Sequence, residues 1–248
     1  MKILILAAGY AVRLRPLTLN TPKPLLEVGK RKILDRIIDR LETLADIESI
    51  SVITNERFYG NFKQWSETAG RKARIDIIND GTTTDENKLG AIGDMRLFAS
   101  RPGADSEVMV IAGDNIFEFG MDKFLEFGRA NGDHVSIAVH DINDRDLARK
   151  YGVVETEEGT RRVKVFEEKP ENPKGTLVAT CVYYFPKGKL GLIEKYFESS
   201  EKHDAPGNFI KWLMDNDAVY GFVFDEDWYD IGSLESYKEA DRRYLKKP

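Results

Sequence analysis

The first 25 residues, MKILILAAGYAVRLRPLTLNTPKPL, contain the stretch that decides the fold. Residues 3–9 are apolar and then small, which predicts a buried strand that ends in a turn of small residues. A polar, basic loop follows, and its prolines hold Arg13, Arg15 and Lys23 near the end of the strand. Because backbone N–H groups at such a strand end can approach a polyanion, the stretch predicts a site for a nucleoside triphosphate.

The same stretch resembles the signature of the sugar-1-phosphate nucleotidyltransferases (NDP-sugar pyrophosphorylases), among them the glucose-1-phosphate thymidylyltransferases. That signature reads Leu-Ala-(Ala/Gly)-Gly-x-Gly-Thr-Arg-Leu-x-Pro-Leu-Thr and, after a short gap, Pro-Lys-Pro-Leu. The resemblance implies that the backbone binds the nucleotide at Ala7, Ala8 and Gly9. Two positions depart from the signature, because Ala11 replaces a Gly and Val12 replaces a Thr. Ala11 then needs a negative or slightly strained φ, and Val12 lacks a hydroxyl that could contact phosphate.

Composition limits the possible partners and compartment. The chain has 248 residues, of which 42% are hydrophobic and 32% charged, as in ordinary soluble globular proteins. Its net charge of −5 argues against a nucleic-acid partner, and no apolar run approaches the roughly 20 residues that span a bilayer. The single cysteine, Cys181, excludes an internal disulfide and suits a reducing compartment. A strand that begins at the N-terminus leaves no room for a signal peptide, so we expect a cytoplasmic protein.

Strand-like and helix-like segments alternate in the first part of the chain. This alternation implies parallel βαβ units and a doubly wound sheet, whose ligands bind at the carboxyl ends of the strands. We therefore expect a Rossmann-like (GT-A-like) α/β fold with a mixed, mostly parallel sheet flanked by helices. The expected strands are 3–7, 49–54, 74–78, 107–112 and 134–140, and the expected helices are 32–44, 57–69, 89–99 and 121–131.

The pattern changes after about residue 140. Short β-rich segments predict a small antiparallel subregion that covers one side of the site. We expect a single domain over 1–248, in which 1–140 mainly binds the nucleotide and 141–248 mainly binds the sugar phosphate. The expected elements of this second part are strands at 152–156, 161–167, 176–185 and 218–224, and helices at 186–200, 207–215 and 233–245.

Gly113-Asp114-Asn115 directly follows the apolar run 107–112. Mg²⁺ prefers one or two carboxylates together with phosphate oxygens and water, so a carboxylate after a buried strand suits a triphosphate site. The alternative is that Asp114 only caps the next turn. The family has the same Gly-Asp-Asn, and this resemblance favours Asp114 as a Mg²⁺ ligand and catalytic residue.

A matching signal near the C-terminus is Trp228-Tyr229-Asp230-Ile231-Gly232-Ser233. It resembles the family's Trp-x-Asp-x-Gly-Thr, which implies that Asp230 is the second metal carboxylate. The alternative is that Asp230 caps the helix that begins near Leu234, but Ser233 is better placed for that role.

Two segments resemble the sugar-binding segments of the family, 151–155 and 166–170. There Gly152 would let the backbone approach a sugar hydroxyl, Glu168 would accept hydrogen bonds from sugar hydroxyls, and Lys169 would meet the sugar phosphate. The alternative for Glu168 and Lys169 is an exposed, charged turn.

The strand that precedes the family's sugar-site Tyr corresponds to residues 179–183, which adds Tyr183 to the sugar-phosphate residues. Thr180 or Cys181 stands where Gly is common, a change that bears on which sugar fits. We interpret Cys181 as a small core residue rather than a reactive thiol.

The segment that reads the base matches the family less well. The family has Gln before Pro and then Gly-Leu-Ala, whereas residues 78–91 read INDGTTTDENKLGA. Asn79 is a shorter amide, and Gly90 would supply a close backbone contact to the base. The role of the Thr/Asp-rich loop 80–88 and the identity of the nucleobase stay open.

The resemblance implies the reaction NTP plus sugar 1-phosphate giving NDP-sugar plus pyrophosphate. The attacking phosphate oxygen is already ionised at neutral pH, so no general base is needed, and catalysis consists of positioning and charge neutralisation. Arg13 would hold the β- and γ-phosphates, and Lys23 would bridge the α-phosphate and the attacking phosphate. Mg²⁺ on Asp114 and Asp230 would neutralise the α-phosphate, and family frequency favours dTTP or UTP with a hexose 1-phosphate.

The sequence also bears on several other functions. The Gly-x-Gly-x-x-Gly of dehydrogenases is absent after Gly9, and no P-loop motif occurs. A glycosyltransferase would share the architecture but would not need the pair Arg13 and Lys23. A cytidylyltransferase acting on another phosphate acceptor remains an alternative, as does a catalytically inactive nucleotide-sugar-binding regulatory subunit, which the changes at Ala11 and Val12 support. Relatives often form dimers or tetramers, so a homo-oligomer is possible, and the short C-terminus predicts no allosteric nucleotide site.

Overall fold

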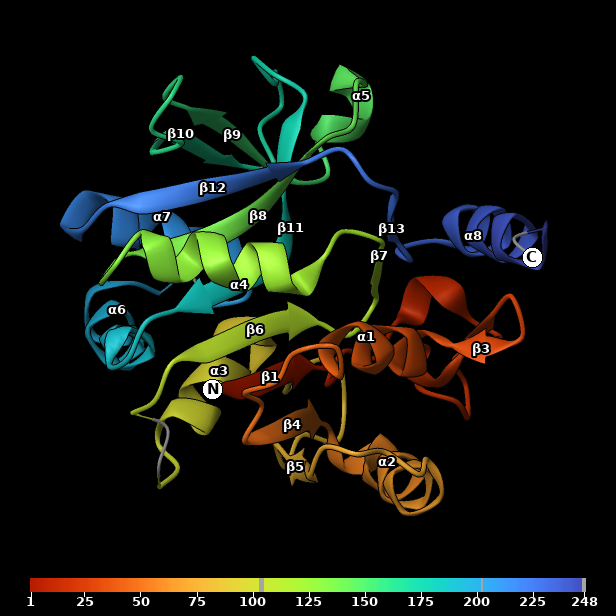
Figure 1. The fold of residues 1–248 in the computed structure, drawn as a ribbon. Helices are drawn as coiled ribbons and strands as arrows, with labels where there is room; N and C mark the ends of the chain where they lie inside the picture. Colours follow the sequence, from red (N-terminus) through yellow and green to blue (C-terminus); the bar gives the residue numbers. More distant parts are fainter. Residues whose placement is uncertain (103–104, 202, 247–248) are drawn as a thin grey trace. The chain divides into compact units, whose positions relative to one another are not determined.

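The computed structural model describes residues 1–102, 105–201 and 203–246. These residues form two compact units, and Figure 1 shows their helices and strands. Unit 1 contains residues 1–89 and 111–121 together with the C-terminal segment from Asp227, and unit 2 contains the described residues of 90–110 and 122–226. The expected division of a single domain near residue 140 stays a prediction.

Three strands of unit 1 pair in parallel. They are β1 (Lys2–Leu6), β4 (Ser49–Thr54) and β5 (Ile75–Asn79), in a register that aligns Ile5 with Val52 and Val52 with Ile77. The connections are the helices α1 (Ile33–Leu41) and α2 (Glu56–Thr68). The side chains at the centre of β1 and β4 are fully buried, and each such aliphatic side chain stabilises the fold by about 1.5–3 kcal/mol.

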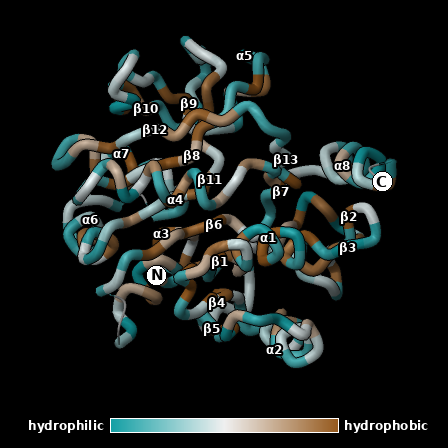
Figure 2. Tube along the Cα trace, in the orientation of Figure 1, coloured by the Kyte–Doolittle hydropathy of each residue, from teal (hydrophilic) through white to brown (hydrophobic). Residues whose placement is uncertain are grey.

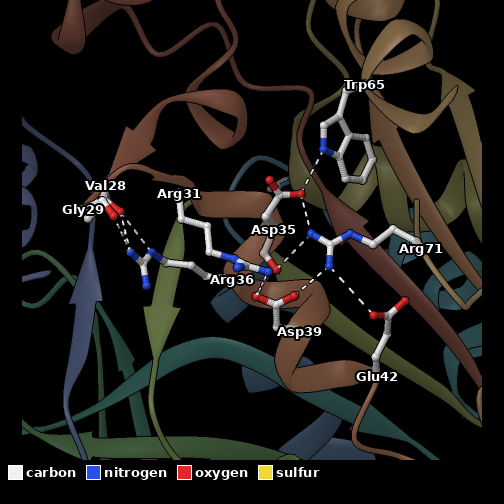
Figure 3. Close-up of polar contacts among 9 residues, drawn as sticks. All are labelled: Val28, Gly29, Arg31, Asp35, Arg36, Asp39, Glu42, Trp65 and Arg71. Carbon is white, nitrogen blue, oxygen red and sulfur yellow. Dashed lines mark hydrogen bonds and ion pairs between the residues drawn. The ribbon is translucent and has the colours of Figure 1, made fainter. Parts of the chain in front are cut away.

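The helix α1 is fixed to its surroundings by an ion-pair network around Arg71 (Figure 3). The Arg71 guanidinium is almost fully buried and contacts the carboxylates of Asp35 at 2.5 Å and Asp39 at 2.6 Å. The indole of Trp65 on α2 donates a hydrogen bond to the same Asp35 carboxylate at 3.1 Å. These bonds join α1 to α2 and to the segment before β5.

Short elements complete unit 1. The 3₁₀ turns η1 (Val12–Leu14) and η2 (Lys23–Leu25) follow β1, and the hairpin β2 (Glu27–Val28) and β3 (Arg31–Lys32) leads into α1. The strand β6 (Val108–Ala112) carries the chain from unit 2 into unit 1. Two three-residue strands, β7 (Asn115–Phe117) and β13 (Trp228–Asp230), then pair antiparallel before the C-terminal helix α8 (Leu234–Lys246).

In unit 2, strand β8 (Val135–Asp141) lies between two partners. It pairs antiparallel with β11 (Leu177–Phe185) and parallel with β12 (Val219–Phe224). The hairpin β9 (Gly152–Thr156) and β10 (Val163–Glu168) joins β11 through the pair Val178 and Val153. The helices are α3 (Gly90–Ala99), α4 (Met121–Ala130), α5 (Arg145–Ala148), α6 (Ile193–Ser199) and α7 (Pro206–Asn216), and a 3₁₀ turn, η3 (Lys189–Leu192), precedes α6.

The Rossmann-like α/β class, with a mostly parallel sheet flanked by helices, is confirmed. Figure 2 shows hydrophobic residues along strands such as β4 and β8 and hydrophilic residues on helices such as α2 and α8. The antiparallel character expected for 152–156, 161–167 and 176–185 is present in β9, β10 and β11. The strand expected at 218–224 is β12, which runs parallel to β8. Within the part of the chain that the structure describes, no helix is long and apolar enough to cross a membrane.

Candidate active site

The loop after β1 is anchored at both ends but keeps its basic side chains exposed. Ala7 donates a backbone hydrogen bond to Ile53 at 2.9 Å, and the far end is held by Arg57, whose guanidinium donates to the Leu19 carbonyl at 2.6 Å. Gly9 is exposed, and no atom lies within 4 Å of where its Cβ would be. The Arg13 guanidinium is also exposed and pairs with no carboxylate among the residues described, so it is available to an anionic ligand.

Ala11 takes the backbone conformation that the family's glycine would favour. Its φ of 46° and ψ of 44° lie in the left-handed region, which costs a non-glycine residue about 1–2 kcal/mol. The Thr18 hydroxyl donates to the Ala11 carbonyl at 2.8 Å and helps to hold this conformation. The sequence left open whether Ala11 has a negative φ or a strained one, and the structure has the strained φ.

The Lys23 ammonium lies between the two segments that carry the expected metal carboxylates. It donates to the Asp114 carboxylate at 2.6 Å and to the Ile231 carbonyl at 3.0 Å. Its side chain is only 14% exposed and that of Asp114 is 31% exposed, so both groups are partly shielded from water. Partial burial strengthens this pair relative to one on the open surface.

The position of Asp114 is fixed by its neighbours in the chain. The Gly113 N–H donates to the Leu6 carbonyl at 2.8 Å, and a Cβ on Gly113 would lie 2.9 Å from that same oxygen. Glycine therefore allows this chain segment to approach the end of β1. The Asp114 side chain follows at the strand end, as the sheet topology predicts for a ligand-binding residue.

The ribbon of β7 and β13 brings Asp114 and Asp230 together at the level of the backbone. Asp230 aligns with Asn115, and the Ile231 N–H donates to the Asp114 carbonyl at 3.1 Å. The Ser233 hydroxyl accepts a hydrogen bond from the backbone N–H of Ser236 at 3.2 Å. Ser233 is thus the cap of α8, as expected, which leaves Asp230 to another role.

The Thr/Asp-rich loop after β5 is ordered by its own side chains. Asp80 accepts hydrogen bonds from the backbone and the hydroxyl of Thr82, at 2.7 and 2.8 Å. The Asn79 side-chain Oδ1 accepts from the Gly81 N–H at 2.8 Å, and its Nδ2 donates to the Glu56 carboxylate on α2. Asn79 would therefore have to exchange these local partners in order to read a base.

Gly90 belongs to unit 2 and has a φ of +74°. A Cβ on it would lie 3.0 Å from the His203 carbonyl and 3.0 Å from the Asp204 Cα. The glycine is therefore required by close packing within unit 2. Its contact with a nucleobase stays a prediction.

The expected sugar-phosphate residues in unit 2 surround the carboxylate of Glu168. Burial raises the pKa of this carboxyl, and the nearby Lys169 ammonium, at 3.7 Å, lowers it to a smaller extent. A Cβ on Gly152 would lie 2.4 Å from the Phe166 ring and 3.2 Å from Glu168. A Cβ on Gly207 would lie only 1.9 Å from Glu168 Oε2. The two glycines thus make room for a half-buried carboxylate.

The bulge in β11 identifies which residue replaces the family's glycine. The register with β8 shifts between Ala179 and Tyr183, and Cys181 within this interval has a φ of 57°. Cys181, rather than Thr180, therefore occupies the glycine-like position. The Tyr183 ring is buried, and this burial, together with the neighbouring Cys181 thiol, raises the pKa of its phenol.

Comparisons with known proteins show the family of this chain. The profile of the family described as "Nucleotidyl transferase" matches residues 2–247. The chain belongs to the nucleotidyl transferase family. Among curated relatives, the bifunctional protein GlmU of Methanocaldococcus jannaschii is 31% identical over 248 residues, and mannose-1-phosphate guanylyltransferase 1 of Arabidopsis thaliana is 32% identical over 248 residues. These matches cover 100% and 99% of this chain but only 55% and 65% of the relatives, so the chain spans little more than half of their length.

Among solved structures, this nucleotidyl transferase chain is similar to one from Bacillus anthracis that is assigned as a glucose-1-phosphate thymidylyltransferase and was crystallised with sucrose. The TM-score is 0.86, and the match covers 100% of this chain and 96% of that one. At 21% sequence identity the likeness shows a shared fold.

The side-chain chemistry of Asp114 and Asp230 suits a divalent cation such as Mg²⁺. Asp114 and Asp230 are partly accessible and lie on paired segments, and two carboxylates with phosphate oxygens and water form the donor set that Mg²⁺ prefers. Among the residues described, no group of three or more His, Cys, Asp or Glu side chains forms a site for a metal held by protein alone. The phosphates of a substrate would therefore have to complete the coordination.

Two features of the site were missed from the sequence. The Ile231 carbonyl is a partner of Lys23, and backbone atoms carry no sequence signal. Gly207 makes room for Glu168, and the pair Pro206-Gly207 at the start of α7 was a signal that could have indicated a close approach there.

Proposed function

We propose that the chain transfers a nucleotidyl group from a nucleoside triphosphate to a sugar 1-phosphate. A phosphate oxygen of the sugar 1-phosphate attacks the α-phosphorus, the bond to the β-phosphate oxygen breaks, and NDP-sugar and pyrophosphate are formed. The observation that best supports this is the Lys23 ammonium held between the Asp114 carboxylate and the Ile231 carbonyl, beside the signature loop. No general base is needed, because the attacking oxygen is already ionised.

Each charged group has a role in bringing two anions together. Arg13, exposed on its loop, would bind the β- and γ-phosphates and stabilise the departing pyrophosphate. Lys23 would contact the α-phosphate and the attacking phosphate. Asp114 and Asp230 would hold Mg²⁺, which when bound neutralises phosphate charge. Glu168 and Lys169 in unit 2 would bind the sugar and its phosphate.

The proposed substrates are a pyrimidine nucleoside triphosphate and a hexose 1-phosphate. We favour dTTP or UTP with a hexose 1-phosphate on family frequency. The names of the relatives include a guanylyltransferase and a thymidylyltransferase, so the family accommodates more than one base. We also propose a cytoplasmic enzyme, in line with its single cysteine, and a homo-oligomeric assembly.

The test is pyrophosphate release by purified protein with Mg²⁺. Five triphosphates (ATP, CTP, GTP, UTP and dTTP) are combined with several sugar 1-phosphates, and each mixture is repeated with EDTA. Release in one combination, abolished by EDTA, is the expected result and names both substrates. If no combination releases pyrophosphate although the protein binds a nucleotide, the sugar acceptor is wrong and the non-sugar acceptor or the regulatory subunit takes its place.

A further inference from the structure

Glu118 joins four elements of unit 1. It follows β7 directly, and its backbone N–H donates to the Asp227 carbonyl just before β13 at 3.0 Å. Its carboxylate accepts hydrogen bonds from Arg40 on α1 and from the Tyr244 hydroxyl on α8. One side chain therefore connects the β7–β13 ribbon to both helices.

Tyr244 contacts four residues from different parts of unit 1. Its ring lies 4.1 Å below the Arg36 guanidinium, which itself donates to the carbonyls of Val28 and Gly29 (Figure 3). A Cβ on Gly29 would lie 2.5 Å from the Tyr244 Cβ, so glycine is needed for this close approach. The ring also meets Tyr229 of β13 edge-on, with centroids 5.9 Å apart. Burial raises the pKa of Tyr244 to about 12, so its hydroxyl stays a donor at neutral pH.

A short segment of chain links Asp230 to α8. Only three residues separate Asp230 from the first residue of α8 at Leu234. At the opposite strand, Asp114 precedes β7 and Glu118 follows it. A shift of α8 relative to Glu118 would therefore move one expected metal carboxylate relative to the other.

We propose that Glu118 and Tyr244 are positioning residues, which hold the β7–β13 ribbon so that the carboxylates of Asp114 and Asp230 can bind one divalent cation. This inference rests on the proposed function. Groups that orient metal ligands without touching the metal typically change metal affinity or activity by about 10–100-fold when they are mutated.

The variants are Tyr244→Phe and Glu118→Gln, with Tyr237→Phe as the matched control. Tyr244→Phe keeps the ring under the Arg36 guanidinium and removes the hydroxyl that donates to Glu118. Tyr237 lies on the same helix, and its hydroxyl donates to the Glu27 carbonyl at 2.8 Å, away from the ribbon. The control therefore removes one hydroxyl hydrogen bond of α8 without touching Glu118.

The measurement is Mn²⁺ binding to the protein in the presence of dTTP, followed by the loss of the free Mn²⁺ electron paramagnetic resonance signal beyond the loss that the same dTTP causes without protein. A Mg²⁺ titration of pyrophosphate release and a thermal unfolding curve accompany it. We expect Tyr244→Phe and Glu118→Gln to weaken Mn²⁺ binding about 10-fold and to raise the Mg²⁺ concentration for half-maximal rate equally, with kcat at saturating Mg²⁺ little changed. Tyr237→Phe should change only the midpoint of thermal unfolding and leave Mn²⁺ binding and the Mg²⁺ titration as in the wild type.

The outcomes separate the two proposals. If the wild-type protein binds Mn²⁺ and turns over, but Tyr244→Phe and Glu118→Gln match Tyr237→Phe in Mn²⁺ affinity, the positioning role is wrong. If the wild-type protein neither binds Mn²⁺ with nucleotide nor releases pyrophosphate, the proposed function itself fails, and the positioning role fails with it.

Discussion

Replacing Gly207 by alanine would place a methyl group where the Glu168 carboxylate lies. The new Cβ would be 1.9 Å from Glu168 Oε2 and 2.8 Å from the Phe166 ring, whereas ordinary contact begins near 3.4 Å. Because the Gly207 backbone is fixed in the first turn of α7, the carboxylate would have to move by about 1.5 Å. This change tests whether Gly207 exists to accommodate Glu168.

Two opposing effects set the expected change in the free energy of unfolding of Gly207→Ala. Overpacking of this kind costs about 1–3 kcal/mol, and a Gly→Ala exchange in a helix returns up to about 1 kcal/mol. We expect a net loss of about 1 kcal/mol in the free energy of unfolding. In a Glu168→Ala background most of the obstruction is gone, so the same exchange should be neutral or stabilising. The coupling between the two positions should then be at least about 1 kcal/mol.

The assay is urea unfolding of the wild type, the two single variants and the double variant. The KM values for the triphosphate and for the sugar 1-phosphate are measured in parallel. Gly207→Ala should raise the KM for the sugar 1-phosphate several-fold and leave the KM for the triphosphate unchanged. Gly191→Ala is the matched control, because no atom lies within 4 Å of its Cβ position. An equal cost of Gly207→Ala in both backgrounds would refute the reasoning.

Three further predictions concern single residues. Gly9→Ala should leave the unfolding midpoint unchanged or higher, because no atom lies within 4 Å of the new Cβ. The same variant should bind the triphosphate more weakly in a calorimetric titration, and unchanged binding would show that Gly9 is not part of the site. Ala11→Gly should raise the free energy of unfolding, measured by urea unfolding, by about 0.5–1 kcal/mol. The free energy gained by removing the left-handed strain exceeds the entropic cost of a glycine in the unfolded chain, and a loss of stability would show that Ala11 is not strained. Burial raises the pKa of Glu168 above 4.5, so the folded protein binds this proton more tightly and the carboxyl's contribution to stability should fall as the pH rises from about 4.5 through the folded-state pKa. Glu168→Gln should remove that part of the slope in unfolding curves recorded against pH, and identical slopes would show that the carboxyl is not buried.

The main elements of the fold were predictable because their periodicity is strong. The buried strand β4 has its expected bounds, and β1, β8 and the amphipathic helix α1 lie within three residues of theirs. The ribbon of β7 and β13 was missed as a pair of strands, since three-residue segments carry too little periodicity and their pairing joins residues more than 100 positions apart.

The chemistry of the site was predictable where charge and spacing carry it. The sequence indicated that Lys23 and Asp114 share a site, and the structure places their charged atoms 2.6 Å apart. It could not indicate that Ala11 and Cys181 would keep the glycine-like conformation, because left-handed strain is tolerated only where surrounding contacts fix it. Backbone partners such as the Ile231 carbonyl are likewise invisible in a sequence.

The central claim is that the Lys23–Asp114 pair belongs to the machinery of nucleotidyl transfer. Its most direct test is the rate of pyrophosphate release by Asp114→Asn and Lys23→Ala, measured with the substrates on which the wild type is active. Both variants are expected to lose about 10²–10³-fold in rate, the effect of removing one electrostatic stabiliser, while their unfolding midpoints stay near the wild-type value. Near wild-type turnover by either variant would contradict the account.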